Sequence, residues 1–550
     1  MTQHAFREWL VPLAAAAMLV AGAGIAADYA AAAPSNEKVK AQIQNGVLNV
    51  SGTSAGDEIV LRLRSGDPTM LEVVADGGVV GHNLRRDRFE SIVVEAGDGD
   101  DLVRIDEVNG AFTDTEATTL AGEAGDDDLR GGSHLETLVG GPGNDTVDGN
   151  QGSDIGFLGS GDDSFTWDPG DGSDIVEGQD GSDTLVFNGS GASENFDASA
   201  NGQRLRFFRS AGNIVMDVDG TEHIDLRALG GADNTVVNDL SATDVVDFDI
   251  DLASSLGGSS GDGSADVVTL NGGSSGEAVA ISGQNGSATA TGLSALARIT
   301  NAEAATDALV VNGLSGNDTI TAATLAASAI KLTLDGGSGD DVLFGGAGVD
   351  QLIGGSGDDN ADGNQGNDVA SLGSGDDSFT WDPGDASDIV EGQDGSDRMI
   401  FNGSSGNENF VVSAVGPRIE FLRNLGNIDM DLNGVERIDL NALGGTDTTT
   451  VNDLTGTDMK DVNVDLAGVL GGGAPDGAAD LVTVNATPGV DVVDIFAVDG
   501  ETLVTGLAAT VRIAHSEPAL DQLVLNTLAG LDQVTVGAGV AALIAVTVNA

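Results

Sequence analysis

Aspartate recurs at intervals of nine residues in two stretches of this chain, each time after several glycines. The clearest unit reads Gly140-Gly-Pro-Gly-Asn-Asp-Thr-Val-Asp148, with aspartate at its sixth position. Carboxylate and turn carbonyl oxygens are the ligands that calcium prefers, since it takes roughly six to eight of them. The position-six aspartates are therefore the predicted metal ligands: Asp127, Asp145, Asp154, Asp163, Asp174, Asp183, Asp341, Asp350, Asp359, Asp368, Asp377, Asp388 and Asp397.

Other metals fit this pattern less well. The chain has no cysteine, and none of the thirteen predicted ligands is a histidine, so zinc lacks its usual sulfur and nitrogen ligands. Magnesium prefers to keep several waters rather than enter a cage made by protein alone. The predicted cofactor is calcium (Ca2+), with several ions per chain.

The rest of each unit predicts a turn followed by a very short strand. Glycines at the first, second and fourth positions permit left-handed or crowded backbone, and a hydrophobe at the eighth position points inward. The predicted inward residues are Leu129, Leu138, Val147, Gly156, Phe165, Val176 and Leu185, then Leu343, Leu352, Ala361, Ala370, Phe379, Val390 and Met399. One apolar residue in nine is a thin core against roughly 1 to 2 kcal/mol of backbone entropy per ordered residue.

Electrostatics also oppose folding without a cation. If two units complete one turn, Asp127, Asp145 and Asp163 stack along one edge. Carboxylates about 4.8 Å apart repel by roughly 3 kcal/mol at an effective dielectric near 20, before salt screening. We therefore expect folding to be coupled to calcium binding.

A second, longer repeat organises the chain. The segment 159–171 recurs unchanged at 373–385, and the shift of 214 residues holds onward without a gap. The predicted organisation is a signal peptide, a β-rich lead-in, and two copies that each hold one nonapeptide block and one irregular β segment. Their boundaries are 1–33 for the signal peptide, 38–121 for the lead-in, 122–186 and 187–335 for the first copy, and 336–400 and 401–550 for the second.

The two nonapeptide blocks resemble the haemolysin-type, or RTX, calcium-binding repeats over residues 122–186 and 336–400. That resemblance implies a parallel β-roll in which two nonapeptides complete one turn. The predicted fold class is all-β, a parallel β-roll or β-solenoid built from the two copies. Glu136 at position six and Gly156 at an inward position depart from the pattern and predict weaker sites nearby.

Three further features leave alternatives open. The Trp167-Asp168 insertion is either a corner in the solenoid or a remodelled site. The strand-like run 245–251 places Asp247, Asp249 and Asp251 on one face. These aspartates form either a solvated strand face or the start of an EF-hand loop. Leu252, however, stands where an EF-hand loop needs glycine. Two weaker repeat-like pieces, 96–103 and 313–320, are not counted as sites.

Charge and the first residues restrict location and partners. With 88 acidic against 22 basic side chains and a net charge of -66, the chain would be repelled by nucleic acid and anionic membranes. An apolar stretch from Leu10 to Ala27, followed by small residues, is typical of a secretory signal peptide. We expect a secreted, extracellular protein without a membrane span in its mature chain, and with a cell-surface or matrix component as a partner besides calcium.

The sequence does not predict an enzyme. Only five histidines are present and no H-E-x-x-H motif occurs. The G-x-S-x-G matches at 257–261 and 272–276 lie in Gly/Ser-rich stretches without the strand-to-helix context of a nucleophile elbow. A structural or surface-interaction role is the main hypothesis, and a secreted hydrolase or carbohydrate-active enzyme that uses the solenoid as a scaffold is the alternative.

Overall fold

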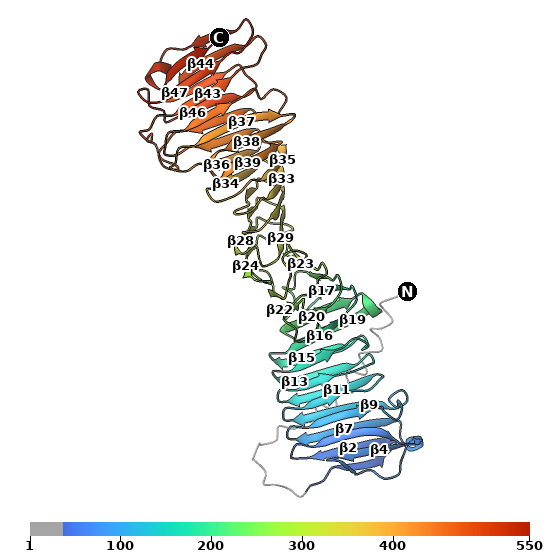
Figure 1. Ribbon diagram of the computed structural model, residues 1–550. Helices are drawn as coiled ribbons and strands as arrows, with labels where there is room; N and C mark the ends of the chain where they lie inside the picture. The colour runs from blue at the N-terminus through green and yellow to red at the C-terminus, as the bar shows by residue number, and fades with distance from the viewer. Residues whose placement is uncertain (1–36, 550) are drawn as a thin grey trace.

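The chain forms one elongated column of stacked β-strands, as seen in the computed structural model, which describes residues 37–549 (Figure 1). The predicted signal peptide, 1–33, lies outside the described residues. Within them there is no α-helix, and no helix is long and apolar enough to cross a membrane. The helical turns are short 3-10 turns, η1 (Arg86–Arg88), η2 (Ala211–Asn213), η3 (Leu425–Asn427) and η4 (Val540–Ala542).

One face of the column is a 24-stranded sheet, here called sheet A. Its strands are β1 (Lys40–Gln44), β2 (Val47–Thr53), β7 (Ser91–Asp98), β9 (Ala117–Ala124), β11 (Glu136–Pro142), β13 (Ile155–Gly161), β15 (Ile175–Gly181), β17 (Asn195–Asn201), β18 (Arg204–Arg209), β19 (Ile214–Asp219), β21 (Asn234–Val237), β23 (Val267–Asn271), β27 (Ala308–Asn312), β29 (Lys331–Ser338), β31 (Asp350–Ser356), β33 (Val369–Gly375), β35 (Ile389–Gly395), β37 (Asn409–Val415), β38 (Arg418–Arg423), β39 (Ile428–Asn433), β41 (Thr448–Val451), β43 (Leu481–Asn485), β47 (Gln522–Asn526) and β49 (Ala545–Asn549).

The remaining strands form the opposite face, sheet B. They are β3 (Glu58–Arg64), β4 (Asp67–Ala75), β5 (Gly78–Val79), β6 (Leu84–Arg85), β8 (Leu102–Asp106), β10 (Asp128–Arg130), β12 (Thr146–Asp148), β14 (Ser164–Trp167), β16 (Thr184–Ser190), β20 (His223–Leu229), β22 (Asp247–Asp251), β24 (Ala278–Gln284), β25 (Ser287–Thr291), β26 (Leu296–Thr300), β28 (Thr319–Leu325), β30 (Val342–Phe344), β32 (Asn360–Asp362), β34 (Ser378–Trp381), β36 (Arg398–Asn402), β40 (Arg437–Asn441), β42 (Asp461–Asp465), β44 (Val492–Val498), β45 (Glu501–Thr505), β46 (Thr510–Ala514) and β48 (Gln533–Val536).

The nonapeptide blocks form the regular part of the column. The chain alternates between the sheets, and each strand pairs in parallel with the strand one turn further along. In sheet A Thr137 pairs with Ile155, and in sheet B Thr146 pairs with Ser164. Each turn therefore takes 18 residues, which confirms the predicted parallel β-roll of two nonapeptides per turn.

The inward residues form a continuous core between the sheets. All fourteen predicted inward positions are buried. Gly156 is the apparent gap, but a Cβ there would lie 2.9 Å from the Phe165 ring. The phenyl ring of the neighbouring unit therefore fills the space that a side chain at position 156 would need.

The Trp-Asp insertion forms a corner, one of the two predicted alternatives. Trp167 ends β14 with a fully buried ring that stacks on Phe187 at a centroid distance of 4.1 Å, and its Nε1 donates to the Gly172 carbonyl at 2.8 Å. Across this corner one turn takes 20 residues. Trp381 makes the same stack on Phe401 in the second copy, at 4.1 Å.

The segments between the blocks continue the solenoid less regularly because antiparallel strands are inserted into both sheets. In the first copy β17, β18 and β19 widen sheet A, and β24, β25 and β26 widen sheet B. The equivalent inserts of the second copy are β37–β39 and β44–β46. Parallel pairing resumes on either side of each insert, so the aspartate-bearing edges remain in line.

Candidate metal sites

The position-six aspartates stack along the two edges of the column, where the chain crosses from one sheet to the other. The N–H of Asp127 donates to Oδ1 of Asp145 at 2.8 Å, and the N–H of Asp145 donates to Oδ1 of Asp163 at 2.7 Å. Asp341 and Asp359 continue the same pattern in the second copy. One oxygen of each carboxylate therefore links successive turns into a ladder.

The other carboxylate oxygen of most ladder residues has no hydrogen-bond partner, although the residues are at most 2% exposed. These unpartnered Oδ2 atoms belong to ten of the thirteen predicted ligands, namely Asp127, Asp145, Asp154, Asp163, Asp183, Asp341, Asp359, Asp368, Asp377 and Asp397. A buried, unpaired carboxylate oxygen is costly unless a cation or donor meets it. The ladders therefore fit a bound cation.

The backbone of the turns can supply further oxygen ligands. A Cβ at Gly141 would lie 1.9 Å from the Glu123 carbonyl oxygen, and one at Gly143 would lie 1.8 Å from the Gly125 oxygen, so the carbonyls of one turn face the next. The described residues contain no group of three or more His, Cys, Asp or Glu side chains able to hold a metal. A calcium ion here would therefore depend on turn carbonyls as well as carboxylates.

Burial changes the protonation of the ladder. It raises the pKa of Asp145 and of Asp359 to about 7, and the neighbouring ladder carboxylates add to the effect. Burial likewise raises the pKa of Asp154 to about 10 and of Asp368 to about 8. Without a cation the ladder therefore favours protonated carboxyls, whereas calcium would bind the ionised form.

The remaining predicted ligands are placed differently. Oδ2 of Asp350 accepts the Gly346 N–H at 2.5 Å, as Oε2 of Glu136 accepts the Gly132 N–H at 2.6 Å in the first copy. We call such a turn closed, because the main chain four residues earlier satisfies the second oxygen. Asp174 and Asp388 are buried after the corners, where their Oδ1 atoms accept ladder N–H groups at 2.8 Å.

Two residues that were not counted from the sequence join the ladder. The N–H of Asp101 donates to Asp127 Oδ1 at 2.8 Å, and that of Asp318 donates to Asp341 Oδ1 at 2.7 Å. Oδ2 of both is buried without a partner. Their signal was visible in the weak repeat-like pieces 96–103 and 313–320, whose glycine and aspartate spacing matches the blocks.

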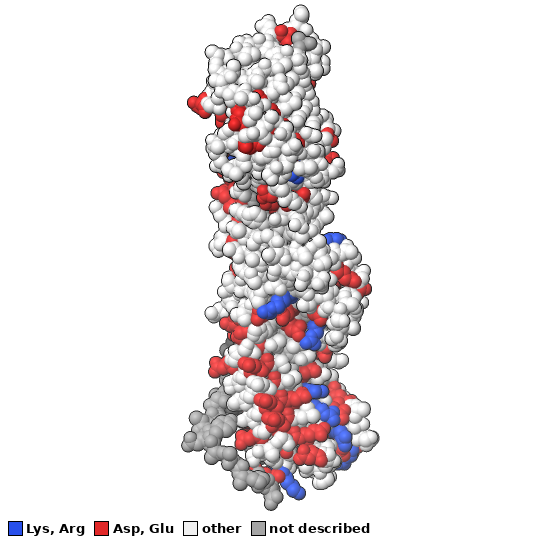
Figure 2. All heavy atoms as spheres, turned by 60° about the vertical axis from the view of Figure 1, so that its left-hand side comes forward, with Lys and Arg blue, Asp and Glu red and all other residues white. Residues whose placement is uncertain are grey.

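A second, exposed ladder at position five also escaped the sequence analysis. The N–H of Asn144 donates to Asp126 Oδ1, and the N–H of Asp162 donates to Asn144 Oδ1, both at 2.8 Å. The residue type at position five varies from unit to unit, so only the stacking of turns reveals this second row of hydrogen bonds. Figure 2 shows that Asp and Glu greatly outnumber Lys and Arg on one face of the column.

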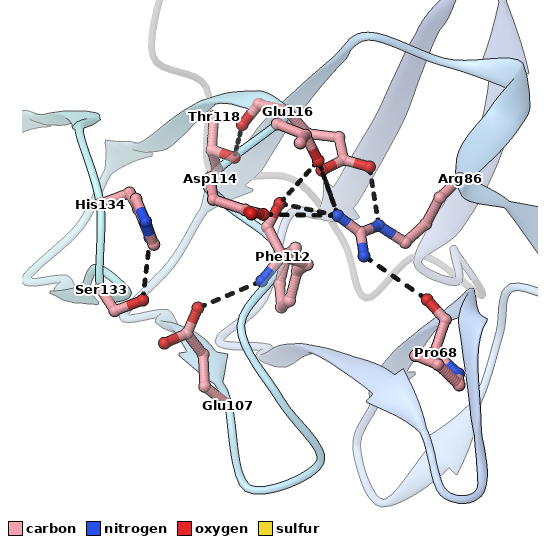
Figure 3. Close-up of polar contacts among 10 residues, drawn as sticks. Pro68, Arg86, Glu107, Phe112, Asp114, Glu116, Thr118, Ser133 and His134 are labelled. Carbon is pink, nitrogen blue, oxygen red and sulfur yellow. Dashed lines mark hydrogen bonds and ion pairs between the residues drawn. The ribbon is translucent and has the colours of Figure 1, made fainter.

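At some edge positions an arginine supplies the positive charge. In the lead-in the Arg86 guanidinium donates from Nε and Nη2 to the two carboxylate oxygens of Glu116 at 2.8 and 2.7 Å (Figure 3). It also donates to the carbonyl oxygens of Phe112 and Pro68 and lies 3.6 Å from Asp114 Oδ1. Carboxylate and carbonyl oxygens thus surround the positively charged guanidinium of Arg86.

The two copies repeat this device at Glu194 and Glu408. Glu194 is buried in an ion pair with Arg209, and Glu408 pairs in the same way with Arg423. The Arg209 guanidinium also lies 5.1 Å from the ring centroid of Trp167. A buried carboxylate that has an internal arginine needs no metal ion.

The acidic strand face at β22 forms ion pairs rather than an EF-hand loop. Asp247, Asp249 and Asp251 lie on one strand that pairs in parallel with β26. Arg298 Nη1 lies 3.1 Å from Asp247 and 3.0 Å from Asp249. These carboxylates are therefore partnered by a neighbouring strand.

Comparison with known proteins identifies the repeat. A family model described as the RTX calcium-binding nonapeptide repeat matches four times, at residues 130–165, 170–189, 333–361 and 353–380. No curated protein matches the chain. Among solved structures, the extracellular lipase LipA from Serratia marcescens is similar at 17% identity and a TM-score of 0.15, over 65% of this chain and 45% of that chain.

The likeness to the lipase is too low to support an inference about activity, and this chain covers less than half of the lipase. The family matches fall on the aspartate ladders of both nonapeptide blocks and include Asp145, Asp163, Asp341 and Asp359. They agree with the 18-residue turns and with the buried, unpartnered carboxylate oxygens. This all-β chain carries RTX calcium-binding nonapeptide repeats in both of its acidic blocks.

Proposed function

We propose that this is an exported structural or surface-interaction protein whose solenoid completes its folding when calcium binds the two aspartate ladders. The observation that carries the proposal is the row of buried Oδ2 atoms without hydrogen-bond partners, at Asp127, Asp145 and Asp163 and again at Asp341 and Asp359. Each is costly in a metal-free fold. Several calcium ions per chain would convert that cost into stabilisation.

The rest of the column supports the proposal that calcium drives folding of the blocks rather than binding to blocks that are already folded. The core of the blocks is thin, with few buried hydrophobic side chains beyond one inward residue per nine. The turns at Glu116, Glu194 and Glu408 instead carry a positive charge of their own, from arginine. The segments around those turns therefore depend less on calcium than the blocks do. Calcium would connect segments of unequal intrinsic stability into one rigid column.

A calcium titration of the chain lacking residues 1–33 tests this proposal. The only tryptophans left would be Trp167 and Trp381, both buried against phenylalanine at the corners within the ladders. Far-UV circular dichroism should show a cooperative gain of β signal, with a simultaneous change in tryptophan fluorescence. Chelation should reverse both signals, and magnesium should not reproduce them. Two unchanged signals would contradict calcium-coupled folding.

Export and a surface partner need separate tests. The apolar stretch from Leu10 to Ala27 supports export with cleavage before or at Ala33. Mass spectrometry of the exported chain should find residues 1–33 missing, and an intact Met1 would contradict this route. Binding of the calcium-loaded chain to washed cells or matrix, with the chelated chain as control, tests for a partner.

One observation favours the alternative, a secreted hydrolase. Ser182 Oγ lies 2.9 Å from His223 Nε2, and His223 Nδ1 lies 3.1 Å from Asp247 Oδ2, the order of contacts found in a serine hydrolase triad. The Ser182 N–H, however, donates to Asp162 Oδ1 rather than facing an oxyanion. The second copy has Arg437 at the position of the histidine.

Hydrolysis of a small aryl ester by the calcium-loaded chain tests the hydrolase alternative. If the triad works, Ser182→Ala should abolish turnover while leaving calcium binding intact. Ser396→Ala, at the same position of the second copy, is the matched control and should have no effect. Turnover that is absent, or equal in all three proteins, would remove the triad from consideration.

A further inference from the structure

Two turns outside the matched repeats have the same backbone as the ladder turns. They end at Asp233 and Asp447, in the irregular segments, 214 residues apart and at the same place in each copy. The family matches stop at 189 in the first copy and at 380 in the second. The second residue of each turn, Leu229 or Leu443, replaces the glycine of the nonapeptide pattern, so the turn is not recognisable as a repeat from its sequence.

The backbone of these turns is nevertheless left-handed at the same two positions. Leu229 has φ 69° and Gly231 has φ 120°, close to the 75° and 140° of Glu123 and Gly125 in the ladder turn that ends at Asp127. In the second copy Leu443 has φ 65°. A left-handed backbone is strained for leucine, and its presence at equivalent positions of both copies indicates a turn shape that surrounding interactions enforce.

The aspartate that ends each turn has an unused oxygen. Asp233 is 3% and Asp447 is 2% exposed. Oδ1 of Asp233 accepts the Glu194 N–H, and Oδ1 of Asp447 accepts the Glu408 N–H, both at 2.8 Å. Oδ2 of each has no hydrogen-bond partner. Among the described residues neither aspartate forms an ion pair, whereas Glu194, one rung earlier, pairs with Arg209.

A second carboxylate reaches each turn from a long loop. Asp262, in the loop 252–266 between β22 and β23, accepts the Gly231 N–H on Oδ2 at 2.6 Å. Asp476, in the equivalent loop 466–480, accepts the Gly445 N–H at 2.9 Å. These loops bring oxygen donors and negative charge to the turn without a basic partner for Asp233 or Asp447.

We propose that the turns ending at Asp233 and Asp447 each bind a calcium ion, as two sites beyond the matched repeats. The ligands would be Oδ2 of the buried aspartate and turn carbonyl oxygens. Asp262 or Asp476, whose two oxygens accept main-chain N–H groups, would add negative charge beside the ion. Oxygen-only donors on a backbone of this shape suit calcium rather than zinc. Each ion would hold a long loop against the edge of the solenoid. This inference rests on the proposed calcium binding of the ladders.

Counting bound calcium tests the proposal. Wild-type chain and the double variant Asp233→Asn/Asp447→Asn are dialysed against the same free calcium concentration, and the metal and protein contents are measured by atomic emission and absorbance. The double variant should hold two ions fewer per chain. The matched control is Asp307→Asn/Asp521→Asn on the same edge, because Oδ2 of Asp307 and Asp521 already accepts a main-chain N–H at 2.6 Å. The control should retain the wild-type number.

The outcomes distinguish calcium binding by the ladders from calcium binding at the two additional turns. A wild-type chain that binds no calcium contradicts the proposed function itself. A wild-type chain that binds several ions, with the same number in the double variant, overturns only the two additional sites. If the double variant fails to fold, Asp262→Asn/Asp476→Asn replaces it, since these carboxylates are only partly buried. Unchanged calcium binding in that folded variant would also overturn the inference.

Discussion

The N–H of Asp127 donates to Oδ1 of Asp145 one turn further along the solenoid, at 2.8 Å, and Oδ2 of the same Asp145 carboxylate is buried with no hydrogen-bond partner. One side chain thus has two roles. One oxygen holds successive turns in register, and the other is left for a cation. Asp350, at the same position of the repeat, has its second oxygen bonded to the Gly346 N–H instead.

This difference predicts unequal effects of one substitution at two repeat positions. Asp359→Asn should weaken calcium binding by at least about tenfold, because it removes a charged oxygen that nothing else satisfies. Asp350→Asn should leave the calcium isotherm close to wild type, because Oδ2 of Asp350 already accepts the Gly346 N–H. Calorimetric titration compares the two variants directly. Equal losses would mean that closed turns also bind metal.

The raised pKa values of the ladder aspartates predict that, without calcium, stability falls as pH rises. Burial raises the pKa of Asp127 and of Asp145 to about 7, well above the usual value of about 4. Between these values the folded chain holds protons that the unfolded chain has lost, so stability falls as pH rises from about 4 to about 7. The β signal of the chelated chain should therefore be largest near the acid end of this window.

Saturating calcium should remove most of that pH dependence, because the metal-bound carboxylates are already ionised. Circular dichroism across the same window, with and without calcium, measures the effect. A calcium-free β signal that grows between about pH 4 and pH 7 would contradict the protonated ladder.

The glycine at position two of the clearest unit should not tolerate a side chain. Gly141 has φ 123°, and a Cβ there would lie 1.9 Å from the Glu123 carbonyl oxygen of the previous turn. Gly141→Ala should lower the stability of the calcium-bound chain by at least about 2 kcal/mol, from backbone strain and from the displaced turn. Thermal unfolding measures it. Gly191→Ala is the control, since nothing lies within 4 Å of its added Cβ, and it should be nearly neutral.

The internal arginines should stabilise the column independently of calcium. Arg209→Met leaves the buried Glu194 carboxylate without its cation and should cost about 3 to 5 kcal/mol in denaturant unfolding at saturating calcium. Adding Glu194→Gln should recover part of that loss. The control is Arg206→Met, whose pair with Asp197 is more than one-third exposed on both sides, and it should cost no more than about 1 kcal/mol. Equal losses would contradict a buried-pair role.

The sequence alone determined the chemistry and the repeat. Aspartate, glycine and one inward hydrophobe at fixed places in nine residues predict an oxygen-lined turn and a minimal strand, and both are local consequences of residue type. The resemblance to the RTX repeats implied that two such units complete one turn, and the pairing of Thr137 with Ile155 confirms it. The same reasoning predicted the corner at Trp167 as one of two alternatives.

Only the tertiary structure decided which carboxylates keep an oxygen without a hydrogen-bond partner. Asp350 and Asp359 occupy the same place in the nonapeptide, and they differ in whether a main-chain N–H reaches the second oxygen. Asp233 became a candidate through the left-handed backbone of Leu229, which no residue pattern indicates. Arg86 meets Glu116 30 residues away. Hydrogen bonds and ion pairs between turns depend on neighbours that are distant in sequence, so local periodicity cannot specify them.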